Sequence, residues 1–150
     1  MYCYKYPRML VTVDAAIFKV DRNKQATHLL LIQRGNNPYK GNYALPGGFP
    51  EMNELLADAA ARELMEETGI AGVDLHQIGA FDDIDRDPRD RNIAIAFWGV
   101  VSDNQATPTA GDDAAKAQWF PLEQLPTLAF DHAKIVKAAL GCLAQWLTEH

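Results

Sequence analysis

The pattern of apolar and polar positions in the first third of the chain predicts β-strands joined by short connections. Residues 10–20 and 29–32 are rich in β-branched and aliphatic side chains, and the polar residues at 21–24 separate them as a hairpin turn would. Residues 34–42 are dense in Gly, Asn and Pro, which predicts a loop. A short strand is expected at 43–45, ending at the Pro-Gly-Gly sequence that follows it.

A helix is predicted for residues 54–68, because apolar and alanine positions recur there at helical spacing. Asn53 is the candidate N-cap of this helix. Gly69 suits the left-handed backbone position that often ends a helix, and Ile70 can supply the hydrophobic contact that accompanies it. The sequence therefore predicts both ends of this helix as well as its body.

The second half of the chain continues with strands and one more helix. Residues 73–81 and 92–101 are expected to be strands joined by a charged connector, and a last short strand is expected at 118–120. Residues 131–147 have apolar positions at helical spacing and are expected to form the final helix. Mixed strands with two helices predict an α+β fold in which helices flank a sheet.

Composition narrows the class of protein. The 150 residues are 48% hydrophobic and 23% charged, which suits one soluble globular domain spanning residues 1–150. The formal net charge of −6 argues against a nucleic-acid-binding surface. Cys3 and Cys142 lack metal-ligand spacing, and the sequence contains neither a signal peptide pattern nor a membrane-length apolar run. We expect a cytoplasmic protein with no membrane partner.

The predicted helix at 54–68 carries a cluster of acidic side chains in its last turns. At about 100° per residue, Glu63 and Glu67 fall on the stripe that begins as a core-packing face, and Glu66 lies beside them. This clustering is unfavourable, because like charges repel and acidic residues near a helix C-terminus oppose the macrodipole. A hard divalent cation would compensate the charges. A solvated acidic face paired with Arg62 is the alternative that the helix alone leaves open.

The wider sequence around this helix resembles the signature of the Nudix hydrolase superfamily. From Gly48 to Glu54 the chain reads GFPEMNE, and after seven further residues it reads RELMEETGI from Arg62 to Ile70. Every defined position of the family pattern is filled, although Asn53 stands where many members have Gly. The resemblance implies an α/β/α sandwich around a mixed sheet, which agrees with the α+β class expected from the elements.

The resemblance also implies roles for individual residues. Glu63, Glu66 and Glu67 would bind Mg²⁺ or Mn²⁺ together with the backbone carbonyl of Gly47. Arg62 would orient Glu63. The metal would polarise a phosphorus–oxygen bond and activate a water molecule. The chain is therefore expected to cleave a pyrophosphate bond in a nucleoside diphosphate derivative.

The base that takes the proton of this water has several candidates. A glutamate of the motif, Glu66 or Glu63, is one of them. In some members of the family the base lies in a later loop, where Asp112 and Asp113 are the candidates in this sequence. The same Gly-Asp-Asp sequence also fits a simple turn, so both interpretations stay open.

A second segment resembles the ADP-ribose pyrophosphatase-like branch of the family. The sequence RDPRDR at 86–91 is similar to the Arg-Asp-Pro-Arg-Gly-Arg segment of that branch, with Asp90 in place of Gly. Arg86, Arg89 and Arg91 would then bind a diphosphate or stack on an adenine ring. A charged surface hairpin is the other interpretation of this segment.

Two further positions carry candidate functional residues. Phe-Asp-His at 130–132 is similar to the same branch and to its transcription-factor relatives, and Asp131 is a candidate N-cap. Arg34 is expected to contact phosphate, with an exposed strand-end charge as the alternative. The expected reaction is hydrolysis of ADP-ribose to AMP and ribose 5-phosphate, and the branch implies a homodimer. A nucleoside-triphosphate or sugar-nucleotide pyrophosphatase and a non-catalytic ADP-ribose-sensing module are the alternatives.

Overall fold

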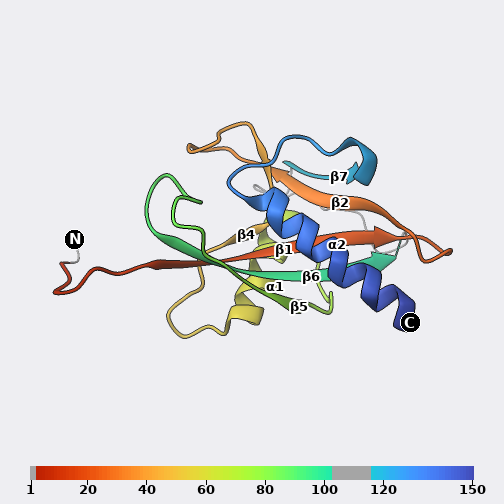
Figure 1. The fold of residues 1–150 in the computed structure, drawn as a ribbon, viewed down its shortest axis with the longest axis horizontal. Helices are drawn as coiled ribbons and strands as arrows, with labels where there is room; N and C mark the ends of the chain where they lie inside the picture. Colours follow the sequence, from red (N-terminus) through yellow and green to blue (C-terminus); the bar gives the residue numbers. More distant parts are fainter. Residues whose placement is uncertain (1–2, 103–115) are drawn as a thin grey trace.

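A computed structural model describes residues 3–102 and 116–150, and a mixed β-sheet is its central element (Figure 1). The strands follow the order β3-β2-β1-β6-β5, with β4 paired to β1 and β7 paired to β2. Their bounds are β1 (Leu10–Val20), β2 (Ala26–Gln33), β3 (Tyr43–Ala44), β4 (Gly47–Gly48), β5 (His76–Phe81), β6 (Asn92–Ser102) and β7 (Ala117–Pro121). The α+β class expected from the sequence is confirmed.

Strand β1 lies at the centre of the sheet, between β2 and β6, and its middle residues are buried on both faces. It pairs in parallel with β6 along its whole length, from Leu10 opposite Asn92 to Val20 opposite Ser102. Its other edge pairs antiparallel with β2 and with the short strand β4. Strands that are buried on both faces carry near-continuous apolar runs, which explains the composition of the segment. Within this run Asp14 is a buried carboxylate.

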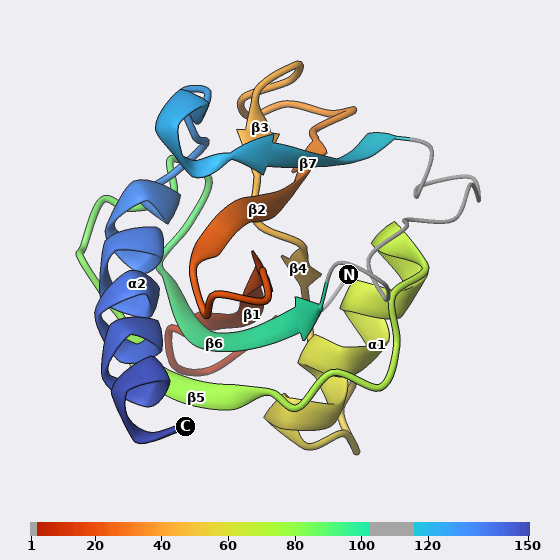
Figure 2. The ribbon, with the colours of Figure 1, turned by 90° about the vertical axis from the view of Figure 1, so that its right-hand side faces the viewer.

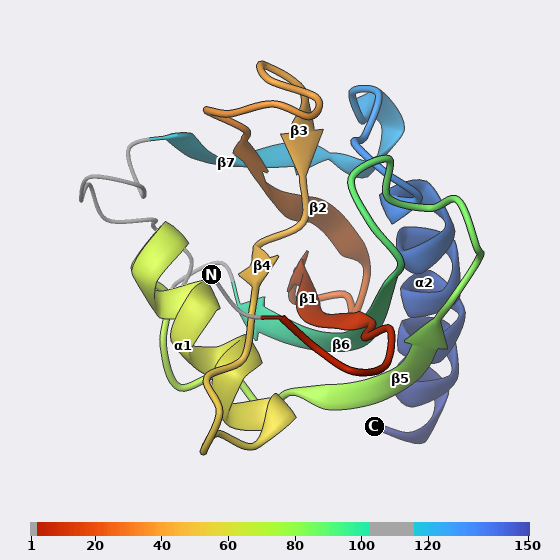
Figure 3. The ribbon, with the colours of Figure 1, turned by 90° about the vertical axis from the view of Figure 1, so that its left-hand side faces the viewer.

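Two helices cover opposite faces of the sheet, as Figures 2 and 3 show from two sides. Helix α1 (Leu56–Thr68) packs on one face through Ala59, Ala60 and Leu64. Helix α2 (His132–Glu149) packs on the other, and its buried residues join the larger core cluster. That cluster contains Ala16, Phe18, Leu29, Leu31, Leu45, Ala96, Trp98, Ile135, Val136, Ala139 and Leu143. No helix in the described ranges is long and apolar enough to cross a membrane.

The start of α1 differs from the prediction. The helix begins at Leu56, its N-cap position is Leu55, and no side chain caps it, so the assignment of Asn53 as N-cap was wrong. The carboxylate of Glu54 instead accepts a hydrogen bond from the backbone N–H of Glu51 and closes a turn just before the helix. The other end agrees with the prediction, because Gly69 has a φ of 77° and its N–H donates to Met65.

The remaining elements match the predicted order with shifted ends. Strand β5 begins three residues later than expected, and β2 extends further at both ends than the apolar core of the strand suggested. The pair of glycines that was expected to end a strand forms β4, which pairs with β1 opposite Val13 and Asp14. Asp131 occupies the N-cap position of α2 but makes no capping hydrogen bond.

Candidate functional site

The acidic face of α1 is organised by a single guanidinium group. Arg62 donates two hydrogen bonds to Glu54 at 2.8 and 2.9 Å, one to Glu63 at 2.9 Å and one to Glu66 at 3.3 Å. Its remaining donor reaches the backbone oxygen of Phe49 at 3.1 Å. The bonds from Arg62, together with the N–H of Glu51, lower the pKa of Glu54 to about 2. The guanidinium therefore partly neutralises the cluster and fixes the loop before the helix.

The two glycines of β4 bring the backbone against the motif glutamates. The N–H of Gly47 donates to Oε1 of Glu67 at 2.8 Å. At Gly48, a β-carbon would lie 2.6 Å from the carboxylate of Glu63, so only glycine permits this approach. Burial raises the pKa of Glu63 above its ordinary range, although the hydrogen bond from Arg62 opposes the shift. Each of these two glutamates therefore contacts β4 as well as its own helix.

The donor chemistry of this face suits a hard divalent cation, because Glu63, Glu66 and Glu67 offer carboxylate oxygens from one side of α1. Their carboxylates are engaged by Arg62 and by the N–H of Gly47. As placed, no three acidic, histidine or cysteine side chains of the described ranges are grouped closely enough to hold a metal.

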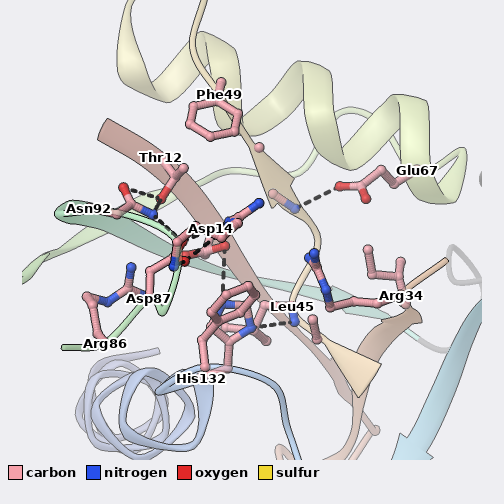
Figure 4. A pocket seen from close by; sticks show the side chains of 16 residues that line it. Thr12, Asp14, Arg34, Leu45, Phe49, Glu67, Arg86, Asp87, Asn92 and His132 are labelled. Carbon is pink, nitrogen blue, oxygen red and sulfur yellow. Dashed lines mark hydrogen bonds and ion pairs between the residues drawn. The ribbon is translucent and has the colours of Figure 1, made fainter. Parts of the chain in front are cut away.

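A cavity lies beside this acidic face, lined by Ile32, Gln33, Arg34, Gly35, Asn36, Glu63, Glu66, Glu67 and Lys116. A second cavity of about 200 Å³ adjoins it, and the two share Ile32, Arg34 and Glu67 (Figure 4). Arg34 lies at the junction, with its Nε bonded to the backbone oxygen of Pro38 at 2.8 Å. Burial, followed by the nearby Arg89, lowers the pKa of Arg34. The cavity lined by the glutamates thus meets the second cavity at the guanidinium group of Arg34.

The floor of the second cavity holds a buried acid and a buried histidine. Nδ1 of His132, in the first turn of α2, accepts a hydrogen bond from the backbone N–H of Leu45 at 3.0 Å. Since Nδ1 is an acceptor, the neutral ring carries its proton on Nε2, which lies 3.6 Å from Oδ1 of Asp14. Burial lowers the pKa of His132 and raises the pKa of Asp14. Burial thus disfavours the charged form of both side chains, and Figure 4 shows them facing each other.

The arginine-rich segment at 86–91 contributes mostly paired side chains to this cavity. Arg86 donates to both carboxylate oxygens of Asp131, at 2.9 and 2.6 Å, and its side chain is only 2% exposed. Arg89 is bonded in the same way to Asp87, at 3.0 and 2.8 Å. Arg91 donates to the backbone oxygen of Asp82 and is not among the residues lining either cavity. Asp112 and Asp113 lie outside the described residues.

Sequence reasoning missed several residues of the second cavity. Asp14, Asn92 and Thr12 line it although no motif included them, and Asp87 lines it although only the arginines of the segment 86–91 were assigned roles. Asn92 and Thr12 are hydrogen-bonded across β1 and β6, although they are 80 residues apart in the chain. An acidic residue inside an otherwise apolar strand is the one signal that could have drawn attention to the position of Asp14.

The family model for the NUDIX domain matches residues 11–139 of the chain. Because this match spans most of the sequence, the chain belongs to the NUDIX domain family, and the resemblance inferred from the motif is confirmed. One relative is an ADP-ribose pyrophosphatase from Methanocaldococcus jannaschii, which is 44% identical over 132 residues covering 88% of this chain and 73% of the relative. Together these similarities confirm the expectation of a Nudix pyrophosphohydrolase.

Two further similarities involve proteins whose names or titles mention ADP-ribose. An ADPR-responsive transcriptional repressor, NtrR of Acinetobacter baylyi, is 37% identical over 92% of this chain, which spans 56% of the repressor. A solved structure of the NUDIX domain of Shewanella oneidensis NrtR complexed with ADP ribose has a TM-score of 0.79 and 29% identity, with 92% of this chain and 90% of that chain covered. The shared fold confirms the Nudix-type arrangement of helices and sheet.

Proposed function

We propose that this chain hydrolyses the pyrophosphate bond of ADP-ribose, giving AMP and ribose 5-phosphate. The observation that carries the proposal is the junction of the two cavities, where Arg34 and Glu67 line both chambers. A ligand with a diphosphate centre can lie across this junction with one end in each chamber. The archaeal ADP-ribose pyrophosphatase and the ADP-ribose-bound NrtR domain support this substrate over nucleoside triphosphates and sugar nucleotides.

The proposed cofactor is a divalent cation, Mg²⁺ or Mn²⁺. Glu63, Glu66, Glu67 and the carbonyl oxygen of Gly47 would hold it, because oxygen donors suit either ion. When bound, such an ion supplies charge neutralisation at the diphosphate and a more acidic water molecule. Arg62 would keep Glu63 oriented as the carboxylates change partners, which is a role that its contacts with Glu54 and Phe49 support.

The arginines around the junction would bind the anionic part of the substrate. Arg34 has one nitrogen committed to Pro38, and its guanidinium lies 4.9 Å from the ring centre of Phe130, at the border of the two cavities. Arg89 is 5.5 Å from the same ring and stays partly exposed. We assign these two arginines to the diphosphate. Arg86 would act while paired with its carboxylate partner, and Arg91 would contact substrate at the outer edge of the loop.

We assign the general base to Glu66. Its side chain is 54% exposed, against 16% for Glu63, so an attacking water molecule can reach its carboxylate. Asp112 and Asp113 are the competing candidates. The separate variants Asp112→Asn and Asp113→Asn test this assignment. If the base lies in the later loop, one of these variants loses activity, and if both stay active the assignment to Glu66 is supported.

The reaction is tested by product analysis with ADP-ribose, NADH, diadenosine polyphosphates, UDP-sugars and nucleoside triphosphates, each with Mg²⁺, with Mn²⁺ and with chelator. Glu66→Gln is the active-site variant, and Glu149→Gln, at the exposed end of α2, is its matched control. We expect AMP and ribose 5-phosphate from ADP-ribose, abolished by chelator and by Glu66→Gln only. Cleavage of another compound with the same dependence would leave the mechanism standing and replace the substrate.

The second candidate function is an ADP-ribose sensor that does not cleave its ligand, which the similarity to the A. baylyi repressor favours. A rise in melting temperature with ADP-ribose, without any product under any metal condition, would support it over hydrolysis.

We also propose a homodimer in the cytoplasm with no nucleic-acid partner, the last because of the net charge of −6. Light scattering and a DNA-binding titration at low salt test the dimer and the absence of nucleic-acid binding.

A further inference from the structure

We propose that Asp14 selects the sugar of the substrate, its buried carboxylate accepting hydrogen bonds from the neighbouring hydroxyl groups of a ribose in the second cavity. This inference rests on the proposed function, because it takes ADP-ribose as the ligand. ADP-ribose carries two riboses, one in adenosine and one at the far end. The shared chemistry is a vicinal diol, and the experiment below distinguishes the two sources.

Most polar groups that line the second cavity already have strong partners within the described part of the chain. Asp87 accepts bonds from Arg89 and from Asn92, and burial notwithstanding, these bonds hold the pKa of Asp87 below its ordinary range. Arg86 is committed to Asp131 through two bonds. The carboxylate of Asp87 is therefore satisfied within the fold and offers little to a ligand hydroxyl group.

Asp14 differs from these groups. Its recorded side-chain partner in residues 3–102 and 116–150 is Nε2 of His132, at 3.6 Å, which is too long for a good hydrogen bond. The side chain is only 9% exposed, and it borders the cavity (Figure 4). A buried carboxylate with weak partners is costly, and hydroxyl groups of a ligand would offset that cost. The acid is therefore an acceptor for donors that the ligand brings.

The bond between Leu45 and His132 determines which group of the histidine faces Asp14. Because Nδ1 of His132 accepts from the N–H of Leu45, protonating the ring fully would break that bond. The histidine thus meets Asp14 as a neutral N–H donor and not as a cation.

The position of Asp14 also places the sugar next to the reaction centre. Asp14 pairs with Gly47 across β1 and β4, and a β-carbon on Gly47 would lie 2.5 Å from Oδ1 of Asp14. The same glycine donates its N–H to Glu67. One residue thus separates the proposed sugar acceptor from a motif glutamate, so a diol at Asp14 leaves the attached phosphate near the junction of the cavities.

One aromatic side chain of the cavity wall, Phe130, is not open for stacking on a base. Phe130 lines the cavity wall next to His132. The centre of its ring lies 5.5 Å from that of His132 and 4.9 Å from that of Tyr39. Two guanidinium groups, those of Arg34 and Arg89, also contact its ring. With these neighbours in place, Phe130 is already engaged and does not present an open stacking surface for a base.

The test is calorimetric and does not depend on turnover. Glu66→Gln serves as the non-cleaving parent, and it is combined with Asp14→Asn or with the control Asp74→Asn, which changes the same functional group at an exposed position. Each protein is titrated with ADP-ribose, ADP, 2′-deoxy-ADP and inorganic pyrophosphate in the presence of Mg²⁺. Asn keeps the shape of Asp but presents an amide donor in place of one acceptor oxygen.

We expect Asp14→Asn to weaken ADP-ribose binding by about 10- to 100-fold, the range of a charge-assisted hydrogen bond, and to leave pyrophosphate binding unchanged. If ADP keeps its affinity, the terminal ribose is the group recognised. If ADP weakens as well and 2′-deoxy-ADP does not, the adenosine ribose is recognised. Unchanged ADP-ribose affinity, or an equal loss for pyrophosphate, would overturn the inference.

The outcome separates this inference from the proposed reaction. Loss of ADP-ribose affinity in Asp14→Asn, with no cleavage of ADP-ribose by the unmodified chain, would retain the sugar site and remove the hydrolase assignment. Cleavage of ADP-ribose by the unmodified chain, with full affinity in Asp14→Asn, would retain the hydrolase and remove the sugar site.

Discussion

Arg86 and Asp131 form a buried ion pair in which two guanidinium nitrogens meet both carboxylate oxygens, although the residues are 45 positions apart. The pair joins the connector between β5 and β6 to the start of α2. It explains why Asp131 caps no helix N–H and why the guanidinium of Arg86 is almost fully buried. The arginine-rich connector is thereby fastened to the wall of the second cavity.

Removing one member of this pair should strongly destabilise the fold. Arg86→Met leaves the carboxylate of Asp131, only 11% exposed, without its partner, and we expect a loss of roughly 3 kcal/mol in the free energy of unfolding. Lys134→Met breaks the exposed ion pair with Asp83 and should change the free energy of unfolding far less. Urea denaturation of both variants measures the difference, and equal changes would contradict the structural role of the buried pair.

The hydrogen bond between Leu45 and His132 predicts a difference between two substitutions. Asn at position 132 can place an oxygen near the position of Nδ1 and keep an acceptor for the N–H of Leu45, whereas Leu cannot. We expect His132→Leu to lose about 1–3 kcal/mol more unfolding free energy than His132→Asn, because a buried N–H is left unsatisfied. Chemical denaturation at neutral pH gives both values. If the two variants are equally stable, the bond contributes nothing measurable.

Stability should also depend on pH through His132. Burial holds the pKa of His132 below its ordinary value of 6.5, so the unfolded chain binds a proton first as the pH falls. The contribution of neutral His132 to the free energy of unfolding is therefore fully present above about pH 6.5. It is lost as the pH decreases, at up to about 1.4 kcal/mol per pH unit. Between about pH 7 and pH 5, the free energy of unfolding should fall less with decreasing pH in His132→Asn than in the unmodified chain. The same pH dependence in both proteins would show that His132 does not cause it.

The two glycines of β4 should respond differently to an added methyl group. A β-carbon on Gly47 would lie 2.1 Å from the backbone oxygen of Val13, so Gly47→Ala has to separate two paired strands. We expect a destabilisation of about 3 kcal/mol, at the upper end for overpacking. At Gly48 the obstacle is the flexible carboxylate of Glu63, so Gly48→Ala should fold normally and lose up to about 100-fold in activity. Thermal unfolding and turnover, measured on both variants, test the contrast; an active Gly48→Ala would refute it.

Arg62 should be sensitive even to conservative replacement. Lys cannot reproduce the five-donor fork that contacts Glu54, Glu63, Glu66 and the backbone oxygen of Phe49. We expect Arg62→Lys to lower kcat/KM by about 10- to 100-fold and to weaken Mn²⁺ binding, measured by electron paramagnetic resonance. Arg22→Lys, an exposed position in the turn between β1 and β2, is the control and should leave both unchanged. Full activity in Arg62→Lys would remove the orienting role.

The elements that the sequence predicted well are those whose signal is local. The strand at Leu10–Val20 was predicted with its observed ends, since an apolar run bounded by polar residues has few other interpretations. The left-handed position of Gly69 follows from the same kind of local preference. Asn53 was misassigned because its capping preference competes with the side chain of Glu54, whose bond to Arg62 spans eight residues.

The acidic face of α1 and the family of the chain could be predicted from the sequence, because helical periodicity and a fixed motif spacing are properties of neighbouring residues. The residues that line the second cavity depend on how the chain folds. Asp14 lies in β1, His132 in α2 and Leu45 between β3 and β4, and they meet because α2 packs on the same face of the sheet toward which Asp14 points. Likewise, the arginine-rich connector could be recognised in the sequence as a charge pattern, but the partners of Arg86 and Arg89 could not be predicted from it. Ion pairing depends on which groups folding brings within a few ångströms, and spacing along the chain does not record that distance.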